Sequence, residues 1–141
     1  SNTLDVPQTF EIALHTYIAI ESVNEVEIDG LENIPYLDQL TDKMHFGDTN
    51  PIRFQEETDR IYQGGANRIT IRDRNQSDGV EIVPKGSMST VVWNPWIGKS
   101  QRMADFGDEE YLQMCCVETA NVRTNRINLK SGQTHTTGVV I

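Results

Sequence analysis

Short segments in which apolar and polar residues alternate make up most of this chain, and turn-forming residues separate them. Over residues 10–20, the larger side chains of an extended strand would share one face, namely Phe10, Ile12, Leu14, Thr16, Ile18 and Ile20. His15 would then lie on the opposite face. A period of two residues is typical of β-strands, and helical periodicity is scarce. The pattern predicts an all-β protein, an antiparallel β-sandwich, and the length suits a single domain over 1–141.

The remaining elements are expected from apolar runs and from the turn residues between them. Further strands are expected at 23–28, 36–38, 60–63, 67–73, 80–83, 88–93, 111–122 and 134–141. The other predictions are a hairpin over 60–73 around Gly64 and Gly65, turns at 29–30 and 75–79, a loop over 41–51, and one short helix over 100–106.

The charge of the chain limits its partners. The formal net charge is −9 at pH 7, and the isoelectric point is near 4.7. Such an acidic surface argues against binding to nucleic acid or to an anionic membrane. No apolar run approaches the roughly 18 residues that a membrane-spanning helix needs. We therefore expect neither a nucleic-acid partner nor a membrane partner.

The two cysteines, Cys115 and Cys116, are neighbours in an expected strand. Adjacent strand residues point to opposite faces, so the two thiols are not expected to form a disulfide with each other. At least one of them should be buried. Free thiols without a disulfide framework favour a cytoplasmic location.

His15 and Glu118 are the leading candidates for chemistry, because each lies inside an expected strand rather than in a loop. An imidazole that faces a carboxylate can move a proton onto one atom and off another. His15 could instead be structural, with its ring bonded to a backbone carbonyl. Glu118 lies in a mostly apolar strand, where an unpaired carboxylate is costly. It must therefore face a polar cleft or pair with a basic residue.

Other candidates have weaker support. Asp59 lies in the charged run 56–60, so it could bind a ligand, pair with Arg60 or simply be solvated. Trp96 could stack on a sugar ring, whereas Trp93 is expected in the core. Lys99 is expected at the surface, although it could attract a phosphate. His45 and His135 are expected at the surface too, and no residue pattern predicts a metal site.

Three groups of residues, in this order, resemble the glucose-6-phosphate 1-epimerases (D-hexose-6-phosphate mutarotases), a branch of the aldose 1-epimerase group. The first group is ALHTY at 13–17, with VEIDGL at 26–31 and YLD at 36–38. The second is ETDRIY at 57–62. The third is VVWNPW at 91–96, with MADFGDEEY at 103–111 and MCCVETANV at 114–122. The resemblance covers most of residues 10–122.

The resemblance implies a fold and an activity. The fold would be the C-terminal half of a galactose mutarotase-like supersandwich, without the N-terminal half that supplies arginines and another histidine in that family. The activity would be interconversion of the α and β anomers of a hexose 6-phosphate, without a cofactor. His15 would protonate the ring oxygen, Glu118 would take the proton of the anomeric hydroxyl, and Asp59 would bind sugar hydroxyls.

Two alternatives and one consequence remain at this stage. The chain could be a carbohydrate-binding sandwich without catalysis, or a mutarotase for unphosphorylated aldoses. Half of a supersandwich would itself be poorly active, because one side of its cleft would be open. It would also expose sheet edges, which favour pairing with another chain. We therefore expect self-association through those edges.

Overall fold

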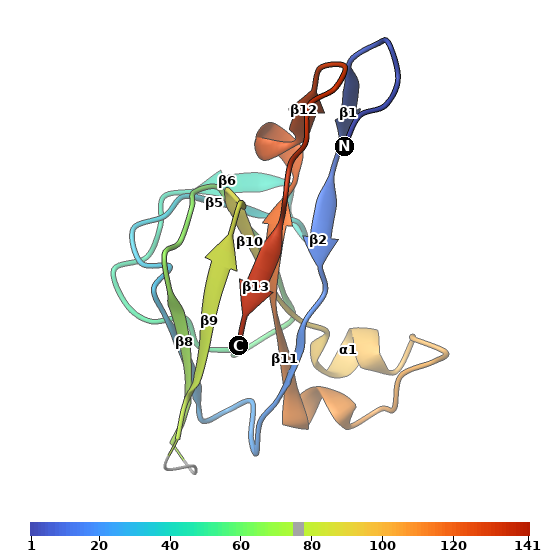
Figure 1. Cartoon of the computed structure of the whole chain (residues 1–141). Helices are drawn as coiled ribbons and strands as arrows, with labels where there is room; N and C mark the ends of the chain where they lie inside the picture. The colour runs from blue at the N-terminus through green and yellow to red at the C-terminus, as the bar shows by residue number, and fades with distance from the viewer. Residues whose placement is uncertain (75–77) are drawn as a thin grey trace.

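The computed structural model describes residues 1–74 and 78–141 and shows a sandwich of antiparallel β-sheets (Figure 1). The strands are β1 Gln8–Phe10, β2 Ile12–Leu14, β3 Tyr17–Ala19, β4 Val26–Asp29, β5 Tyr36–Asp38, β6 Lys43–His45, β7 Thr58–Tyr62, β8 Ile69–Asp73, β9 Val80–Lys85, β10 Ser89–Asn94, β11 Met114–Asn121, β12 Ile127–Leu129 and β13 Gly138–Val140. The helices are short: α1 Trp96–Ser100 and the 3-10 turns η1 Glu110–Gln113 and η2 Arg123–Asn125.

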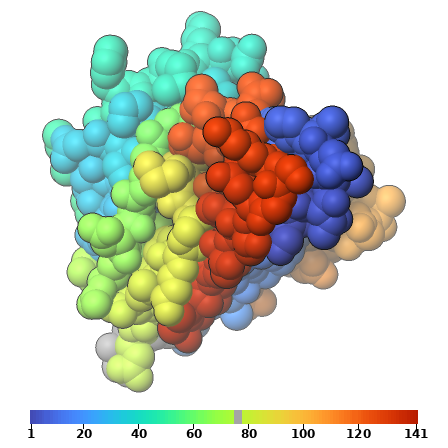
Figure 2. Space-filling view, turned by 45° about the horizontal axis from the view of Figure 1, so that its top comes forward, coloured from blue at the N-terminus to red at the C-terminus, as the bar shows by residue number. Residues whose placement is uncertain are grey.

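Two larger sheets form the layers of the sandwich. The first has seven strands in the order β2-β11-β10-β7-β5-β6, and β3 also pairs with β11. The second has four strands in the order β13-β9-β8-β4. A two-stranded ribbon of β1 and β12 extends from one end. Figure 2 shows the C-terminal segment, in red, running across the surface between β9 and the N-terminal residues. The predicted all-β antiparallel sandwich is confirmed.

The main core fills the space between these two sheets. From the seven-stranded sheet come Ile18, Cys115, Val117, Val92, Tyr62 and Tyr36, and from the four-stranded sheet come Val26, Ile28, Ile69, Ile71 and Ile82. Burying one aliphatic side chain of this size contributes about 1.5–3 kcal/mol. The central strands of the larger sheet, together with β3 and β5, therefore have one face fixed against the core. Their other face is free to build a site.

The segment expected as one long strand over 10–20 is interrupted. Strands β2 and β3 both pair with β11, and residues 15 and 16 separate them. The register does not change across this break, because Leu14 lies opposite Thr119 and Tyr17 lies opposite Cys116. The predicted faces are confirmed from residue 12 onward, since Ile18 and Ile20 are buried while the alternate residues are exposed. Phe10 departs from the prediction, because it is 40% exposed and pairs with β12 in the separate ribbon. The unchanged register places His15 beside Glu118.

Several other expected elements were wrong. Residues 60–73 do not form a hairpin, because β7 belongs to the seven-stranded sheet and β8 to the four-stranded sheet. The loop expected over 41–51 contains β6, and the helix expected over 100–106 lies earlier, at α1. Strand β12 was not expected. The turn predicted at 75–79 lies partly outside the described residues.

The turn expected at 29–30 ends β4, and it requires glycine. Gly30 has a φ of +96°, and a Cβ there would lie 2.2 Å from the carbonyl oxygen of Arg68. Both cysteines are free and buried, as expected, and they belong to different apolar clusters on the two faces of β11. In the part of the chain that the structure describes, no helix is long and apolar enough to cross a membrane.

Candidate active site

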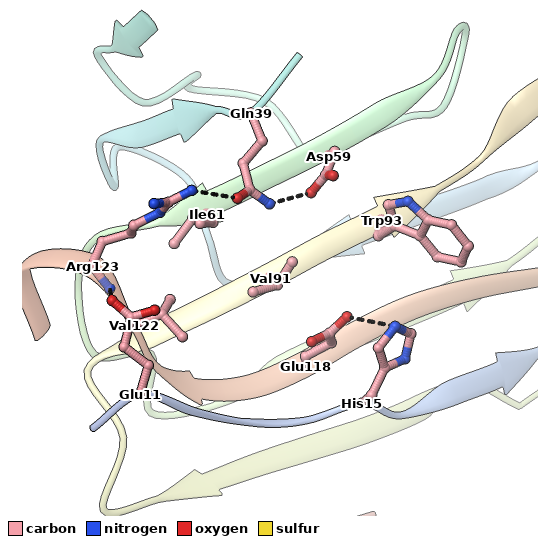
Figure 3. Close-up of a pocket in the computed structure, with 10 residues that line it drawn as sticks. All are labelled: Glu11, His15, Gln39, Asp59, Ile61, Val91, Trp93, Glu118, Val122 and Arg123. Carbon is pink, nitrogen blue, oxygen red and sulfur yellow. Dashed lines mark hydrogen bonds and ion pairs between the residues drawn. The ribbon is translucent and has the colours of Figure 1, made fainter. Parts of the chain in front are cut away.

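A cavity of about 380 Å³ lies on the face of the seven-stranded sheet that does not contact the main core (Figure 3). The strand register explains which side chains reach it. Val91 of β10 lies directly between Glu118 of β11 and Ile61 of β7. One step along the same face, Trp93 lies between Cys116 and Asp59. Alternate residues of three neighbouring strands therefore form the floor of the cavity.

One wall of the cavity is an acid–base pair. His15 Nε2 lies 3.2 Å from Glu118 Oε1, and Figure 3 shows the two side chains pointing toward each other. The His15 side chain is 49% exposed, whereas that of Glu118 is only 7% exposed. Burial raises the pKa of the Glu118 carboxyl, the nearby His15 opposes this rise, and the Asp59 charge adds to it. The result is a carboxylate that binds a proton more readily than a solvated one.

Aromatic rings and a thiol surround the imidazole of His15. The ring stacks on Tyr17 with 4.7 Å between centroids, and the edge of Trp93 lies 5.9 Å away. Cys116 Sγ lies 3.7 Å from His15 Nδ1. Lys99 Nζ lies 5.7 Å from the centre of the Trp93 ring. These contacts fix the plane of the imidazole while half of its surface stays open to the cavity.

The opposite wall is a chain of hydrogen bonds. Gln39 Nε2 donates to Asp59 Oδ1 at 2.6 Å, and Gln39 Oε1 accepts from the Arg123 guanidinium at 3.1 Å. The backbone N–H of Arg123 in turn donates to Glu11 at 2.8 Å. Because Arg123 can only donate, the amide of Gln39 must turn its NH₂ group toward Asp59. Figure 3 shows Gln39 and Asp59 across the floor from His15 and Glu118, Arg123 at one end of the cavity, and Glu11 on the same segment as His15.

The two walls are spaced for a small polar ring. Strands β11 and β7 are separated by β10, so Glu118 and Asp59 come from strands about 10 Å apart. Between them the floor is apolar, formed by Val91 and Ile61. A molecule with hydroxyls at its rim and C–H bonds on its faces fits such a surface. Among the described residues, no group of histidine, cysteine and acidic side chains could hold a metal ion.

The structure brings together three of the four residues predicted from sequence. His15, Glu118 and Asp59 all line the cavity. Trp96 does not line it, because its ring packs on Tyr111 and against the main core. Trp93 lines it instead. Trp93 is nevertheless buried, as expected, with only 8% of its surface exposed.

Sequence reasoning missed three polar residues that line the cavity. Glu11, Gln39 and Arg123 lie in or beside short elements without a recognisable motif. Only the fold brings Gln39 to Asp59, Arg123 to Gln39, and Glu11 to Arg123. Lys99 has a partner at the surface, since its Nζ lies 3.7 Å from Glu57.

Comparison with known proteins gives consistent results. A family profile described as aldose 1-epimerase matches residues 1–141. The chain is 38% identical over 134 residues to a protein of Cenchrus ciliaris named "Putative glucose-6-phosphate 1-epimerase", covering 94% of this chain and 40% of that protein. It is 29% identical over 117 residues to a Haemophilus influenzae protein of the same name, covering 82% of this chain and 41% of that one.

A solved structure confirms the fold. The chain superposes with a TM-score of 0.81 on a crystal structure described as a "putative mutarotase" of Salmonella typhimurium, covering 89% of this chain and 42% of that one at 24% identity. The chain thus spans about 40% of the length of the curated relatives it matches, and it corresponds to their C-terminal part.

Proposed function

Because this chain belongs to the aldose 1-epimerase family, we propose that the protein interconverts the α and β anomers of a hexose by acid–base ring opening. The observation that carries this proposal is the 3.2 Å contact between His15 Nε2 and Glu118 Oε1 at the wall of a cavity of sugar size. One pair of side chains can then act on the two oxygens bonded to C1 of the sugar, the anomeric hydroxyl and the ring oxygen.

The reaction needs one proton removed and one proton delivered. Glu118 takes the proton of the C1 hydroxyl while His15, as the imidazolium, gives a proton to the ring oxygen O5. The C1–O5 bond breaks and leaves an open-chain aldehyde. Rotation about C1–C2 presents the other face of the carbonyl, and the reverse transfers close the ring and restore both side chains. Each positioned acid or base of this kind typically raises the reaction rate by about 10²–10⁴-fold.

The surroundings of Glu118 suit the role of the base. Its low exposure and the nearby Asp59 charge raise its pKa, which increases its affinity for the proton. A general base works best when its pKa approaches the operating pH. A protonated His15 beside the carboxylate opposes this rise and favours the ionised form that acts as a base.

The far wall suits the recognition of hydroxyls. Gln39 occupies one oxygen of Asp59, and the other can accept a hydrogen bond from a sugar hydroxyl. Trp93 offers an aromatic surface at the edge of the floor for the C–H face of the sugar. The sugar would thus be oriented from one side while His15 and Glu118 act from the other.

We further propose a hexose 6-phosphate as the substrate, with glucose 6-phosphate as the first to test. The support is the resemblance of the sequence motifs and the names of the two curated relatives. The cavity itself has three carboxylates, Glu11, Asp59 and Glu118, against the single guanidinium of Arg123. A phosphate would therefore have to lie at the rim, away from those carboxylates.

Exchange NMR between the two anomers tests the proposal. We expect the chain to exchange the anomers of glucose 6-phosphate above the buffer rate, and His15→Ala and Glu118→Gln to abolish that gain. His45→Ala and Glu56→Gln are matched controls outside the cavity and should keep it. Equal exchange in the wild type and in both site variants would contradict the proposal. Binding of the sugar without exchange would favour a carbohydrate-binding function, and faster exchange of glucose than of glucose 6-phosphate would contradict the phosphate preference.

A further inference from the structure

Both ring nitrogens of His15 have a partner on the same strand. Glu118 Oε1 lies 3.2 Å from Nε2, and Cys116 Sγ lies 3.7 Å from Nδ1. Residues two apart on a strand project from the same face, with their Cα atoms about 7 Å apart. The imidazole therefore bridges the side chains of Cys116 and Glu118.

We propose that Cys116 is a positioning residue that holds His15 by Nδ1, so that Nε2 is the nitrogen that gives and takes the proton in ring opening. This inference rests on the proposed function. Cys116 is fully buried, at 0% exposure, directly opposite Tyr17 on one side and Trp93 on the other. The same two rings contact the imidazole. The thiol thus lies beneath the imidazole in a closed layer rather than at a reactive surface.

A thiol suits this position because it can pair with Nδ1 in every protonation form of the His15 ring. In a neutral ring with its proton on Nε2, the Glu118 carboxylate accepts from Nε2–H, so Nδ1 needs a donor, and the S–H group supplies it. In the imidazolium, Nδ1 carries a proton, and the sulfur accepts it. After Nε2 has given its proton to the sugar, Nδ1–H still donates to the sulfur, and the Nε2 lone pair is ready to take the proton back. A thiol can donate or accept, and its hydrogen turns to suit.

A backbone carbonyl in the same place would serve only two of these states. It accepts but cannot donate, so it would force a neutral ring to keep its proton on Nδ1. The lone pair of Nε2 would then face the Glu118 carboxylate, which is repulsive. Burial raises the pKa of the Cys116 thiol, and the Glu118 charge adds to the rise, so the S–H proton is retained.

The test compares three substitutions at this position. Cys116→Ala and Cys116→Val remove the hydrogen-bonding group, and Cys116→Ser keeps a group that both donates and accepts. Cys115→Ala is the matched control, because it removes the neighbouring buried thiol from the other face of the strand. The readouts are the ¹⁵N resonance of His15 Nδ1 in the substrate-free protein and the kcat and KM of anomer exchange.

We expect the Nδ1 resonance to move in Cys116→Ala and Cys116→Val, with kcat lowered about tenfold and KM unchanged, because a misplaced general acid loses part of its effect. Cys116→Ser should restore most of kcat, and Cys115→Ala should leave the resonance in place. Alanine and valine change the volume in opposite directions, so whichever variant folds decides the result. An unmoved Nδ1 resonance, or equal kcat in the serine and alanine variants, overturns the positioning role. Because the resonance needs no substrate, absence of exchange in the wild type would overturn the proposed function separately.

Discussion

Glu118 combines burial with charge, and this combination has opposite consequences for stability and for chemistry. Its side chain is 7% exposed, and burial is the main cause of its raised pKa. The folded protein therefore binds this proton more tightly than the unfolded chain does. The sign of the linkage follows: the contribution of Glu118 to stability falls as the pH rises from its ordinary pKa near 4.5 through its raised value in the folded protein.

The substitution Glu118→Gln separates the two effects. We expect anomer exchange to fall at least about 10²-fold because the base is lost. The free energy of unfolding at pH 7 should stay unchanged or rise by about 1 kcal/mol, because a neutral amide is less costly to bury than a carboxylate. Urea denaturation at pH 5 and pH 7 measures this, with Glu56→Gln as the exposed control. A stability lower than the wild type at both pH values would contradict it.

Asp59 offers a second test at the residue scale, through the pH dependence of exchange. The Glu118 carboxylate must be ionised to act as a base, so kcat/KM should fall as the pH decreases through its raised pKa. The Asp59 charge contributes to that rise. In Asp59→Asn, we expect the acidic limb of the pH profile to move to lower pH, besides any loss of sugar binding. An acidic limb that stays at the same pH would show that the charge of Asp59 does not affect the pKa of Glu118.

The sequence alone indicated the acid–base pair and Asp59 opposite it, but not the polar side chains that surround Asp59. His15 and Glu118 could be recognised because a polar group inside an apolar strand needs an explanation, and the family motif supplied one. Gln39 and Arg123 are ordinary polar residues near turns, and their role exists only because β5 and the end of β11 converge on Asp59. Trp96 was predicted at the site because tryptophan suits sugars, but its packing against Tyr111 takes it elsewhere.

At the element scale, local patterns predicted strands better than they predicted strand partners. The strand expected over 88–93 closely matches β10, and that over 36–38 matches β5. The hairpin over 60–73 was wrong because glycines between two apolar runs fit a tight turn and a crossover between sheets equally well. Strand β6 was missed because Lys-Met-His carries no alternating pattern, and its pairing with β5 defines it.

Asn94 joins several of these elements at the end of β10. The residue is fully buried, and its side-chain amide donates to the carbonyl oxygens of Tyr111 and Met114, each at 2.9 Å. Its oxygen accepts from the backbone N–H of Trp96. One side chain therefore connects the end of β10, the start of α1 and the segment that leads into β11.

We expect Asn94→Ala to lower the free energy of unfolding by about 2–4 kcal/mol, because buried backbone groups lose their hydrogen-bond partners. Asn94→Asp should be at least as destabilising as Asn94→Ala, because it buries a carboxylate against the two carbonyl oxygens that have lost their donor. Urea denaturation gives both values. Asn128, an exposed residue of β12, supplies the control Asn128→Ala. A loss below 0.5 kcal/mol in Asn94→Ala, typical of surface positions, would show that these contacts do not stabilise the junction.

At the scale of the whole molecule, the net charge of −9 and the exposed edge of the larger sheet have opposite effects on self-association. Strand β6 ends the strand order of that sheet, and large apolar side chains are exposed there: Met44 at 59% and Phe46 at 95%. Exposed edges with apolar side chains favour pairing with another chain. The acidic surface opposes the approach of two copies, and salt weakens that repulsion.

We therefore expect the chain to self-associate through β6 at high protein concentration, and more strongly as salt is added. Sedimentation velocity over a concentration series, at low and at high ionic strength, measures this. The variants Met44→Lys and Phe46→Asp should each shift the population toward the monomer. Ile97→Lys is the control, because Ile97 is also half-exposed but lies on α1, away from the sheet edge. Because Met44→Lys and Phe46→Asp change the net charge in opposite directions, a shared effect would identify the lost apolar surface rather than charge as its cause. Association that Ile97→Lys weakens as much as Phe46→Asp does would place the contact elsewhere on the molecule.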